Sequence, residues 1–323
     1  MEHGCPDCTF ILPSDADRDD WLDARREGLG SSDASTIAGV NPYSTLYELW
    51  LDKTGRGFEQ PYTAEMRFGH LIEDDARQVF TEDTGIDVTV PGLARSNTRS
   101  WQQCTVDGLT SDGGILEIKS VGWRLAHLWD DEQVADHAEV QVQWAMDVTG
   151  RRHAWVVAVI EREFVIRRVE YDPALAATVR AMGSEFWHEN VLGDEEPALV
   201  AADLNVVKRR NPAATSGRVK ASQTSWLDDT LTAYAEAKMA VKTAEEEKDR
   251  IEAELVDYIG DAEAAGTIDD DGDILITVTR KNITRNGFDT ASLREAHPDL
   301  YEQYATTTTH RRLSVLARPR KAT

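Results

Sequence analysis

The amino-acid sequence predicts a mixed α/β core of roughly 200 residues, followed by a helical, α+β C-terminal extension. Predicted helices alternate with two pairs of short strands between residues 21 and 203, and one long predicted helix dominates residues 226–323. The chain has 323 residues, of which 41% are hydrophobic and 29% are charged. It therefore has enough apolar material for a core, which excludes collagen-like, mucin-like and wholly disordered chains.

The first part of the core is predicted to contain three helices. Residues 31–33 are Ser-Ser-Asp, which are favoured N-cap types, so a helix is expected to begin there. A second helix is expected over residues 45–54. A third is expected over residues 63–84, where apolar side chains recur at helical spacing until Gly85. Residues 1–20 are polar, and we expect them to form a flexible N-terminus.

Two hairpins complete the expected core. Residues 105–110 and 115–120 form the first hairpin, because the Ser-Asp-Gly-Gly sequence between them is a strong turn signal. Residues 154–160 are a continuous apolar, β-branched run typical of a buried strand, and residues 164–171 follow as its hairpin partner. Further helices are expected over residues 138–149 and 172–190.

The remainder of the chain differs in composition. Residues 204–225 are interpreted as a basic linker, and residues 226–323 as the C-terminal extension. Residues 226–259 are rich in Ala, Glu and Lys and predict one long helix. Charged residues share its apolar register, so a helix packed along a neighbouring domain or subunit is favoured over a coiled coil. A strand over residues 274–279 and a short helix near 289–297 are expected to follow.

The charge balance limits the classes of partner. The chain carries 58 acidic and 35 basic residues, for a net charge of −23. This argues against a protein that coats nucleic acid nonspecifically, but it leaves open an enzyme with a local basic channel. Basic residues gather at 151–168, 208–220 and 309–321, and we expect these clusters to line any path for nucleic acid.

Hydropathy and cysteine content indicate a cytoplasmic protein. No run of about 18 apolar residues is present, so no membrane span is expected, and no signal peptide is visible. Three cysteines cannot make a closed disulfide framework, which suits a reducing compartment. Cys5 and Cys8 form a C-x-x-C pair, which is either part of a zinc or iron–sulfur site or two free thiols. No second motif supplies the other ligands, so free thiols are favoured.

The segment from Asp107 to Lys119 carries the clearest chemistry. Glu117 and Lys119 lie two residues apart on a predicted strand, so their side chains project from one face. The hairpin can bring Asp107 close to Glu117, and two converging carboxylates suit Mg²⁺ or Mn²⁺. The Ile118 carbonyl could add a further oxygen. Lys119 beside them can orient or deprotonate a water, or stabilise charge on a phosphate.

A Glu-x-Lys pair also has a simpler interpretation. On an edge strand it is usually a solvated face with a weak ion pair. The flanking residues favour the functional interpretation, because Ile115, Leu116 and Ile118 are apolar and indicate a largely buried strand. Buried charges are costly unless they are paired or serve a purpose.

Two more residues fit the same centre. Glu73 in the predicted helix 63–84 could offer a third carboxylate, although it could equally be an exposed helix acid. Gln143 could reach the centre from the helix over residues 138–149. Gln141 and Gln143 point to different helix faces, so at most one of them is expected to do so.

Together these motifs resemble the PD-(D/E)XK nuclease superfamily, and more closely the YqaJ-type viral recombinases of the phage lambda exonuclease family. The D-x9-E-x-K hairpin, the upstream G-H-x-x-E at residues 69–73 and the downstream Q-V-Q-W at 141–144 carry the resemblance. The stretch R-R-E-G-L-G-S-S-D-A at 25–34, followed by N-P-Y at 41–43 and E-L-W-x-x-K-T-G at 48–55, strengthens it. The resemblance covers about residues 21–170 and is weak beyond residue 205.

The resemblance implies a nuclease core, with a mixed central sheet flanked by helices, over residues 21–203. It also implies a metal site for Mg²⁺, or alternatively Mn²⁺. Asp107, Glu117 and the Ile118 carbonyl would hold the ion, and Glu73 would complete the acidic cluster.

Further roles follow from the same resemblance. Lys119 would assist the attacking water, and Gln143 would position Lys119 or that water. Arg25 and Ser32 match the positions that grip the 5′-phosphate of a DNA end, and Arg26 could take the place of Arg25. These roles suit the residue types, because a guanidinium fork and a helix N-terminus both bind phosphate oxygens. A surface arginine and a helix cap are the alternative interpretation of Arg25 and Ser32.

The implied activity is a metal-dependent exonuclease acting from the 5′ end on double-stranded DNA. It would leave 3′ overhangs for phage-type recombination by strand annealing. The implied partners are double-stranded DNA ends, a single-strand annealing protein and further copies of the chain in a trimer. The implied location is the cytoplasm of a bacterial host, with the gene encoded by a phage or prophage.

Three alternatives stay open on the sequence. A structure-specific or restriction-type endonuclease would keep the same core, but no helix-turn-helix or other specificity module is evident. A catalytically inactive scaffold that binds DNA ends is disfavoured, because the acidic residues and the lysine are all present. An iron–sulfur nuclease is disfavoured because the four-cysteine pattern is missing.

Overall fold

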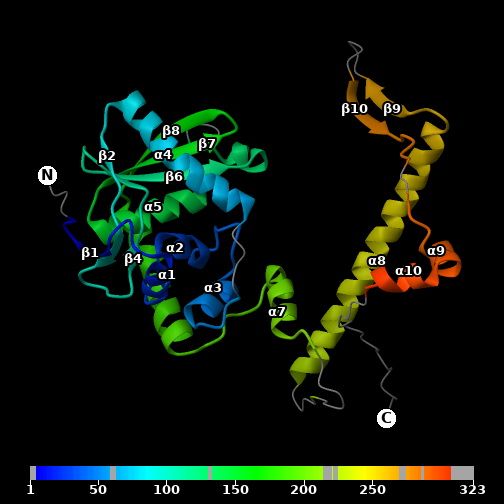
Figure 1. Ribbon diagram of the computed structural model, residues 1–323, viewed down its shortest axis with the longest axis horizontal. Coiled ribbons are helices and arrows are strands. Elements are labelled where there is room, and N and C mark those ends of the chain that lie inside the picture. Colours follow the sequence, from blue (N-terminus) through cyan, green and yellow to red (C-terminus); the bar gives the residue numbers. More distant parts are fainter. Residues whose placement is uncertain are drawn as a thin grey trace. The chain divides into compact units, whose positions relative to one another are not determined.

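The computed structural model describes residues 5–58, 63–129, 133–213, 220, 225–268, 274–284 and 287–306 (Figure 1). The chain divides into two compact units, Met1–Arg210 and Asn211–Thr323. The first unit contains all of the candidate site residues named above. Among the described residues, no helix is both long enough and apolar enough to cross a membrane.

A five-stranded mixed sheet forms the centre of the first unit. Its order is β2-β5-β6-β7-β8; the central strands β6 and β7 are parallel, and the other neighbours are antiparallel. The expected hairpins are both confirmed, as β5–β6 and β7–β8. The strands span β2 (Val88–Thr89), β5 (Gly108–Thr110), β6 (Ile115–Val121), β7 (His153–Ile160) and β8 (Glu163–Glu170).

Helices cover both faces of this sheet (Figure 1). On one face, α4 (Ala64–Thr84) packs Ala76 and Phe80 against Leu116 and Ile118 of β6. On the other face, α5 (Asp136–Thr149) belongs with Ile115 to the larger core cluster. Because side chains alternate along a strand, the odd-numbered residues of β6 face α5. Glu117 and Lys119 therefore point toward α5, and the even-numbered residues point toward α4.

Local sequence signals explain most boundaries of the helices. Helix α4 begins after Thr63, whose hydroxyl accepts a hydrogen bond from Met66 N, and it ends at Gly85 in the left-handed conformation. Helix α3 (Leu46–Lys53) follows a capping box in which Thr45 and Glu48 each accept from the other's backbone N–H. The remaining helices of the first unit are α1 (Arg18–Arg26), α2 (Ser31–Ile37), α6 (Pro173–Glu185) and α7 (Leu204–Arg210). Shorter helical turns are η1 (Trp123–Trp129), η2 (Phe186–Leu192) and η3 (Ala201–Asp203).

The structure corrects two predicted boundaries. Residues 1–20 were expected to be flexible, but Cys8–Leu12 forms strand β1, which pairs with β3 (Leu93–Ser96) in a small sheet that also contains β4 (Gln103–Cys104). Residues 204–225 were expected to be a linker, but α7 is a helix within the first unit. The partner of β1 lies more than 80 residues away in sequence, so no local pattern could reveal this pairing.

Helix α8 (Ser225–Ile259) dominates the second unit and confirms the predicted long helix. A hairpin of β9 (Ala264–Ile268) and β10 (Ile274–Thr279) follows, and then α9 (Thr290–Ala296) and α10 (Pro298–Tyr304). The basic cluster at 309–321 lies outside the described residues.

The N-terminal cysteines are joined to each other. Cys5 and Cys8 form a disulfide, whereas the sequence favoured two free thiols and left a metal site open. Cys104 is free and buried, and burial raises the pKa of its thiol.

Candidate active site

The register of the β5–β6 hairpin places Asp107 beside Glu117. Gly108 lies opposite Leu116, so the residue before Gly108 lies opposite the residue after Leu116. Asp107 N donates to the Leu116 carbonyl at 3.1 Å, and Ile118 N donates to Asp107 Oδ2 at 2.6 Å. The Asp107 carboxylate therefore takes the place of a backbone partner for Ile118 N, just before β5 begins. The hairpin thus brings together the two carboxylates that the sequence predicted to converge.

The Ile118 carbonyl faces the same edge. The N–H and C=O of one strand residue point toward the same neighbouring strand, and Ile118 N points to Asp107. The Ile118 oxygen is therefore directed toward the Asp107 side of β6 and away from β7. This placement agrees with the expectation that it could join the two carboxylates.

Lys119 is held against Glu117 on the α5 face. Its ammonium nitrogen lies 2.6 Å from Glu117 Oε1 and also donates to Gln141 Oε1. The Glu117 side chain is 11% exposed and that of Lys119 is 21% exposed, so the pair is largely shielded from water. This is not the solvated ion pair of the simpler interpretation.

Burial and neighbouring charges shift the pKa values of Asp107 and Lys119. Burial and the nearby Glu117 carboxylate raise the pKa of Asp107 to about 8, because two negative charges compete for one small region. Burial lowers the pKa of Lys119, but attraction and hydrogen bonding to Glu117 outweigh it, so the net shift is upward. Lys119 is therefore a cation in this arrangement at neutral pH.

Gln141, not Gln143, reaches this centre from α5. Gln141 accepts the Lys119 hydrogen bond, whereas Gln143 is fully buried on another side of the helix. Gln143 Nε2 donates to the Glu170 carbonyl, and its Oε1 accepts from Asp172 N, both at 2.8 Å. The expectation that chose Gln143 was wrong in this respect. Two residues along a helix turn the side chain by about 200°, and only the packing of α5 decides which glutamine faces β6.

Glu73 approaches from the opposite face of the sheet. Its Oε2 lies 3.1 Å from Arg77 Nη2, and Arg77 Nε donates to the Asp107 carbonyl at 2.8 Å. Glu73 is close enough that its charge also raises the pKa of Asp107. Within the described part of the chain, no group of three or more His, Cys, Asp or Glu side chains is arranged to hold a metal ion. The expected three-carboxylate cluster is thus represented by a pair, with Glu73 held by Arg77.

The donor set nevertheless fits a hard cation. Mg²⁺ is commonly bound through one or two carboxylates and keeps several waters, so a third protein carboxylate is not required. Burial and the Glu117 carboxylate raise the pKa of Asp107, and a bound cation would stabilise its ionised form. Asp107, Glu117 and the Ile118 carbonyl are the atoms that could hold it.

Arg25 and Ser32 form a second polar centre at the start of α2. Arg25 Nη2 donates to Ser32 Oγ at 2.5 Å and lies 3.3 Å from Asp33 Oδ1, and its guanidinium stacks over the Trp21 ring. The two residues predicted to grip a phosphate are therefore in direct contact. Arg26 points elsewhere and pairs with Asp23 at the surface, so it does not take the place of Arg25.

Asp33 holds the groups of this second centre together. Asp33 Oδ2 lies 2.7 Å from Lys53 Nζ and accepts from Gly30 N at 2.8 Å, while Lys53 Nζ also donates to the Arg25 carbonyl at 2.9 Å. Burial raises the pKa of Asp33, but the charges of Lys53 and Arg25 outweigh it, so the pKa is lowered. A Cβ at Gly28 would fall 2.6 Å from the Trp101 carbonyl oxygen, so only glycine allows the loop before α2 to lie this close to the core.

A chain of hydrogen bonds connects the two centres. Gln141 Nε2 lies 3.4 Å from Ser35 Oγ, and Ser35 Oγ donates to the Ser32 carbonyl at 2.8 Å. Gln141 thus bonds Lys119 through one end of its amide and α2 through the other. The arginine–serine pair and the lysine–carboxylate pair consequently belong to one continuous site.

Comparisons with known proteins bear on the family. Residues 20–152 match the family model of the YqaJ-like viral recombinase domain. The matched residues include every candidate site residue described so far, from Arg25 to Gln143. The uncharacterized protein YqaJ of Bacillus subtilis (strain 168) is 29% identical over 310 residues, which span 94% of this chain and 95% of that protein.

Solved structures also resemble this chain. The alkaline exonuclease LHK-Exo from Laribacter hongkongensis is 26% identical; the similarity covers 60% of this chain and 97% of that one, with a TM-score of 0.47. A phage related exonuclease from Haemophilus somnus 129PT is 14% identical; the similarity covers 52% of this chain and 96% of that one, with a TM-score of 0.38.

Two aromatic residues near Lys119, Tyr43 and His137, were not predicted from the sequence. Tyr43 follows α2 and is 71% exposed, and its ring meets the His137 ring edge-on at 6.4 Å between centroids. Burial and the charge of Lys119 lower the pKa of His137, and Tyr43 lies within electrostatic range of Lys119. Both rings therefore lie near the lysine. The N-P-Y motif marks Tyr43 in the sequence, but nothing local pairs it with His137.

We predict that Asp33→Asn lowers the free energy of unfolding by about 3 kcal/mol near neutral pH, because Lys53 loses its buried partner. The pKa of Asp33 is lower in the folded chain than its ordinary value of 3.8. The ionised carboxylate therefore stabilises the fold above this value, and the stabilisation is lost as the pH falls through the folded pKa. The difference between wild type and variant is expected to be full near pH 7 and to shrink below about pH 3.8.

Urea denaturation of wild type and variant near pH 7 and again below about pH 3.8 checks this prediction. Asp23→Asn is the matched control, since Asp23 is 79% exposed and its pair with Arg26 lies at the surface. The control is expected to change the free energy of unfolding by less than about 0.5 kcal/mol. A loss for Asp33→Asn that is the same at both pH values would contradict the assignment of this ion pair.

Proposed function

We propose that this protein is a metal-dependent exonuclease of the PD-(D/E)XK type that acts on the 5′ ends of double-stranded DNA. One observation carries the proposal. The shielded Glu117–Lys119 pair beside Asp107 is linked through Gln141 and α2 to the Arg25–Ser32 pair. A charged reaction centre and a phosphate-type cradle then share one site, as an enzyme that works at a phosphorylated end requires. The similarity of residues 20–152 to the YqaJ-like viral recombinase domain agrees with this chemistry.

Asp107, Glu117 and the Ile118 carbonyl are proposed to hold a Mg²⁺ or Mn²⁺ ion, with Glu73 near enough to contribute if it leaves Arg77. The bound ion would supply Lewis-acid neutralisation of charge on the scissile phosphate. The remaining roles in the reaction are assigned to side chains of the protein.

Lys119 is proposed to orient the attacking water and to stabilise negative charge on the phosphate. Its raised pKa keeps it protonated, so it acts as a hydrogen-bond donor and a fixed charge, not as a base. Glu117 and Gln141 hold the ammonium from two sides and so limit the positions that it can take. Such fixed charges stabilise a transition state without reorganising during the reaction.

Arg25 and Ser32 are proposed to bind the 5′-phosphate of the strand being degraded. The Arg25 guanidinium has further N–H donors beyond the one that contacts Ser32 Oγ, so it can present a fork to phosphate oxygens. Stacking on Trp21 restrains the guanidinium. Tyr43, which is exposed, and the half-buried His137 are proposed to contact the terminal base, since aromatic rings beside a nucleotide site can stack on any base.

The reaction balances as a hydrolysis. Water forms a bond to phosphorus, the bond between phosphorus and the 3′ oxygen breaks, and that oxygen leaves with a proton. The products are a 5′-mononucleotide and a strand shortened by one nucleotide, which exposes a 3′ overhang. The proposal extends to strand annealing in phage-type recombination inside a bacterial host, with an annealing protein and a trimeric ring as the expected assembly.

Linear and closed circular DNA test the proposed activity. With Mg²⁺ present, wild type is expected to release mononucleotides from linear duplex with 5′-phosphates and to leave relaxed closed circles intact. Lys119→Met is expected to slow release by about a hundredfold or more, because it removes the fixed charge. Nicking of the circles would identify an endonuclease, and equal rates for wild type and Lys119→Met would contradict the assigned site.

The two glutamines of α5 provide a second prediction. Gln141→Leu is expected to lower kcat about 10- to 100-fold, because Lys119 loses a partner that orients it. Gln143→Leu is the matched control. It should leave kcat within about threefold while lowering the free energy of unfolding by roughly 1–3 kcal/mol, because two backbone groups lose their partner. Steady-state rates and urea denaturation measure both variants, and the opposite pattern would show that Gln143 serves the reaction.

A further inference from the structure

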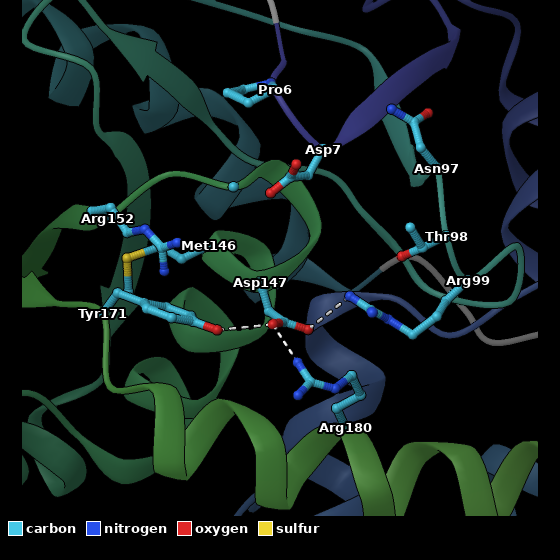
Figure 2. Close-up of a pocket in the computed structure, with 11 residues that line it drawn as sticks. Pro6, Asp7, Asn97, Thr98, Arg99, Met146, Asp147, Arg152, Tyr171 and Arg180 are labelled. Carbon is cyan, nitrogen blue, oxygen red and sulfur yellow. Dashed lines mark hydrogen bonds and ion pairs between the residues drawn. The ribbon is translucent and has the colours of Figure 1, made fainter.

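A cavity of about 440 Å³ lies on the first unit away from the candidate active site. It is bounded by the chain before β1, the turn after β3, the end of α5, the end of β8 and α6 (Figure 2). None of the residues that line it belongs to the Lys119 or Arg25 centres. Asp147, which faces it, is six residues beyond Gln141 on α5, or about 9 Å along the helix axis.

Asp147 at the base of the cavity already has its hydrogen bonds. Its Oδ1 accepts from Tyr171 at 2.9 Å and from Arg180 at 2.5 Å, and its Oδ2 accepts from Gln102 at 2.9 Å and from Arg99 at 3.3 Å. Figure 2 shows the tyrosine and the two arginines converging on this carboxylate. One carboxylate thus binds two guanidinium groups and has no acceptor to spare.

The arginines keep unused donors. A guanidinium has five N–H groups. Arg180 directs only some of them to Asp147 and to the nearby Tyr171 hydroxyl. Arg99 uses Nε on Gln102 and one Nη2 hydrogen on Asp147. Arg152 stacks on the Tyr171 ring at 4.8 Å. In the described part of the chain, the Arg152 guanidinium has no ion pair or hydrogen bond.

The charge at the cavity is unusual for this chain. Three arginines face two carboxylates, Asp7 and Asp147, so the wall carries a positive excess in a protein of net charge −23. Burial of Asp147 beside Arg99 and Arg180 fixes these two guanidinium groups, and Tyr171 fixes the third by stacking. Donors that are held in place lose little freedom when a ligand arrives.

We propose that Arg99, Arg152 and Arg180 form a second anion site, which binds a phosphate group outside the candidate active site. A phosphate has oxygens on all sides and can accept hydrogen bonds from several guanidinium groups, and all three arginines line this one cavity. The group could come from the backbone of a nucleic acid strand or from a free mononucleotide. This site does not depend on the proposed function, because binding there needs no catalysis.

Binding titrations of the full chain without divalent metal test the proposal. The probes are inorganic phosphate, dAMP and a single-stranded oligonucleotide with a 5′-hydroxyl. Arg152→Gln is the main variant, since Arg152 is exposed and holds no ion pair among the described residues. Arg56→Gln is the matched control, because Arg56 also stacks on an aromatic ring, that of Trp50 at 4.8 Å, and its loss changes the net charge equally. Arg56 is exposed and lies outside the basic clusters that are expected to line a path for nucleic acid. Repeating the series with Arg25→Gln removes the contribution of the other phosphate-type centre.

We expect Arg152→Gln to weaken the binding of at least one probe about tenfold, with or without Arg25→Gln. Arg56→Gln is expected to change the affinity for each probe by no more than about twofold. Arg152→Lys should lose about threefold, because it keeps the charge but not the fork. Loss for phosphate and dAMP alone assigns the site to free nucleotides, and loss for the oligonucleotide assigns it to a strand. The proposal is overturned if a folded Arg152→Gln protein, judged by circular dichroism, binds all three probes as wild type does, or if Arg56→Gln loses as much affinity as Arg152→Gln.

Discussion

The register between β5 and β6 is the constraint on which the candidate site depends. With Gly108 opposite Leu116, Asp107 lies across from Glu117. The Asp107 carboxylate accepts a hydrogen bond from Ile118 N just before β5 begins. A slip of one residue would turn Glu117 and Lys119 toward α4 and the apolar cluster there. The buried neighbours Leu116 and Ile118 prevent that slip, since they would lose their contacts with α4.

The charges in this site are stabilised as a group. Two buried carboxylates as close as Asp107 and Glu117 repel each other, and the ammonium of Lys119 offsets part of this repulsion. Gln141 accepts a second hydrogen bond from the same ammonium. Gln141 also reaches Ser35, so the same amide couples the sheet to α2. On α2, Asp33 serves a comparable purpose by holding Lys53 beneath Arg25. A shielded network of this kind fixes side-chain positions, which is what a reaction centre needs.

Local sequence signals predicted much of this structure. The Ser-Asp-Gly-Gly turn predicted the hairpin that brings Asp107 to Glu117, and Thr63 and Gly85 marked the ends of α4. The contact between Arg25 and Ser32 agrees with the motif-based expectation. What could not be predicted depends on distant packing. The pairing of β1 with β3, the choice of Gln141 over Gln143 and the meeting of Tyr43 with His137 are all set by elements far apart in the chain.

Direct measurement of Mn²⁺ binding tests the central claim that Asp107 and Glu117 form one ion-binding pair. Electron paramagnetic resonance reports free Mn²⁺ in titrations of wild type, Asp107→Asn and Glu117→Gln, without any need for DNA or turnover. The account predicts saturable binding of one ion to wild type and at least a tenfold weaker affinity, by roughly 1.4 kcal/mol, for each variant. Equal affinity of all three proteins would contradict it.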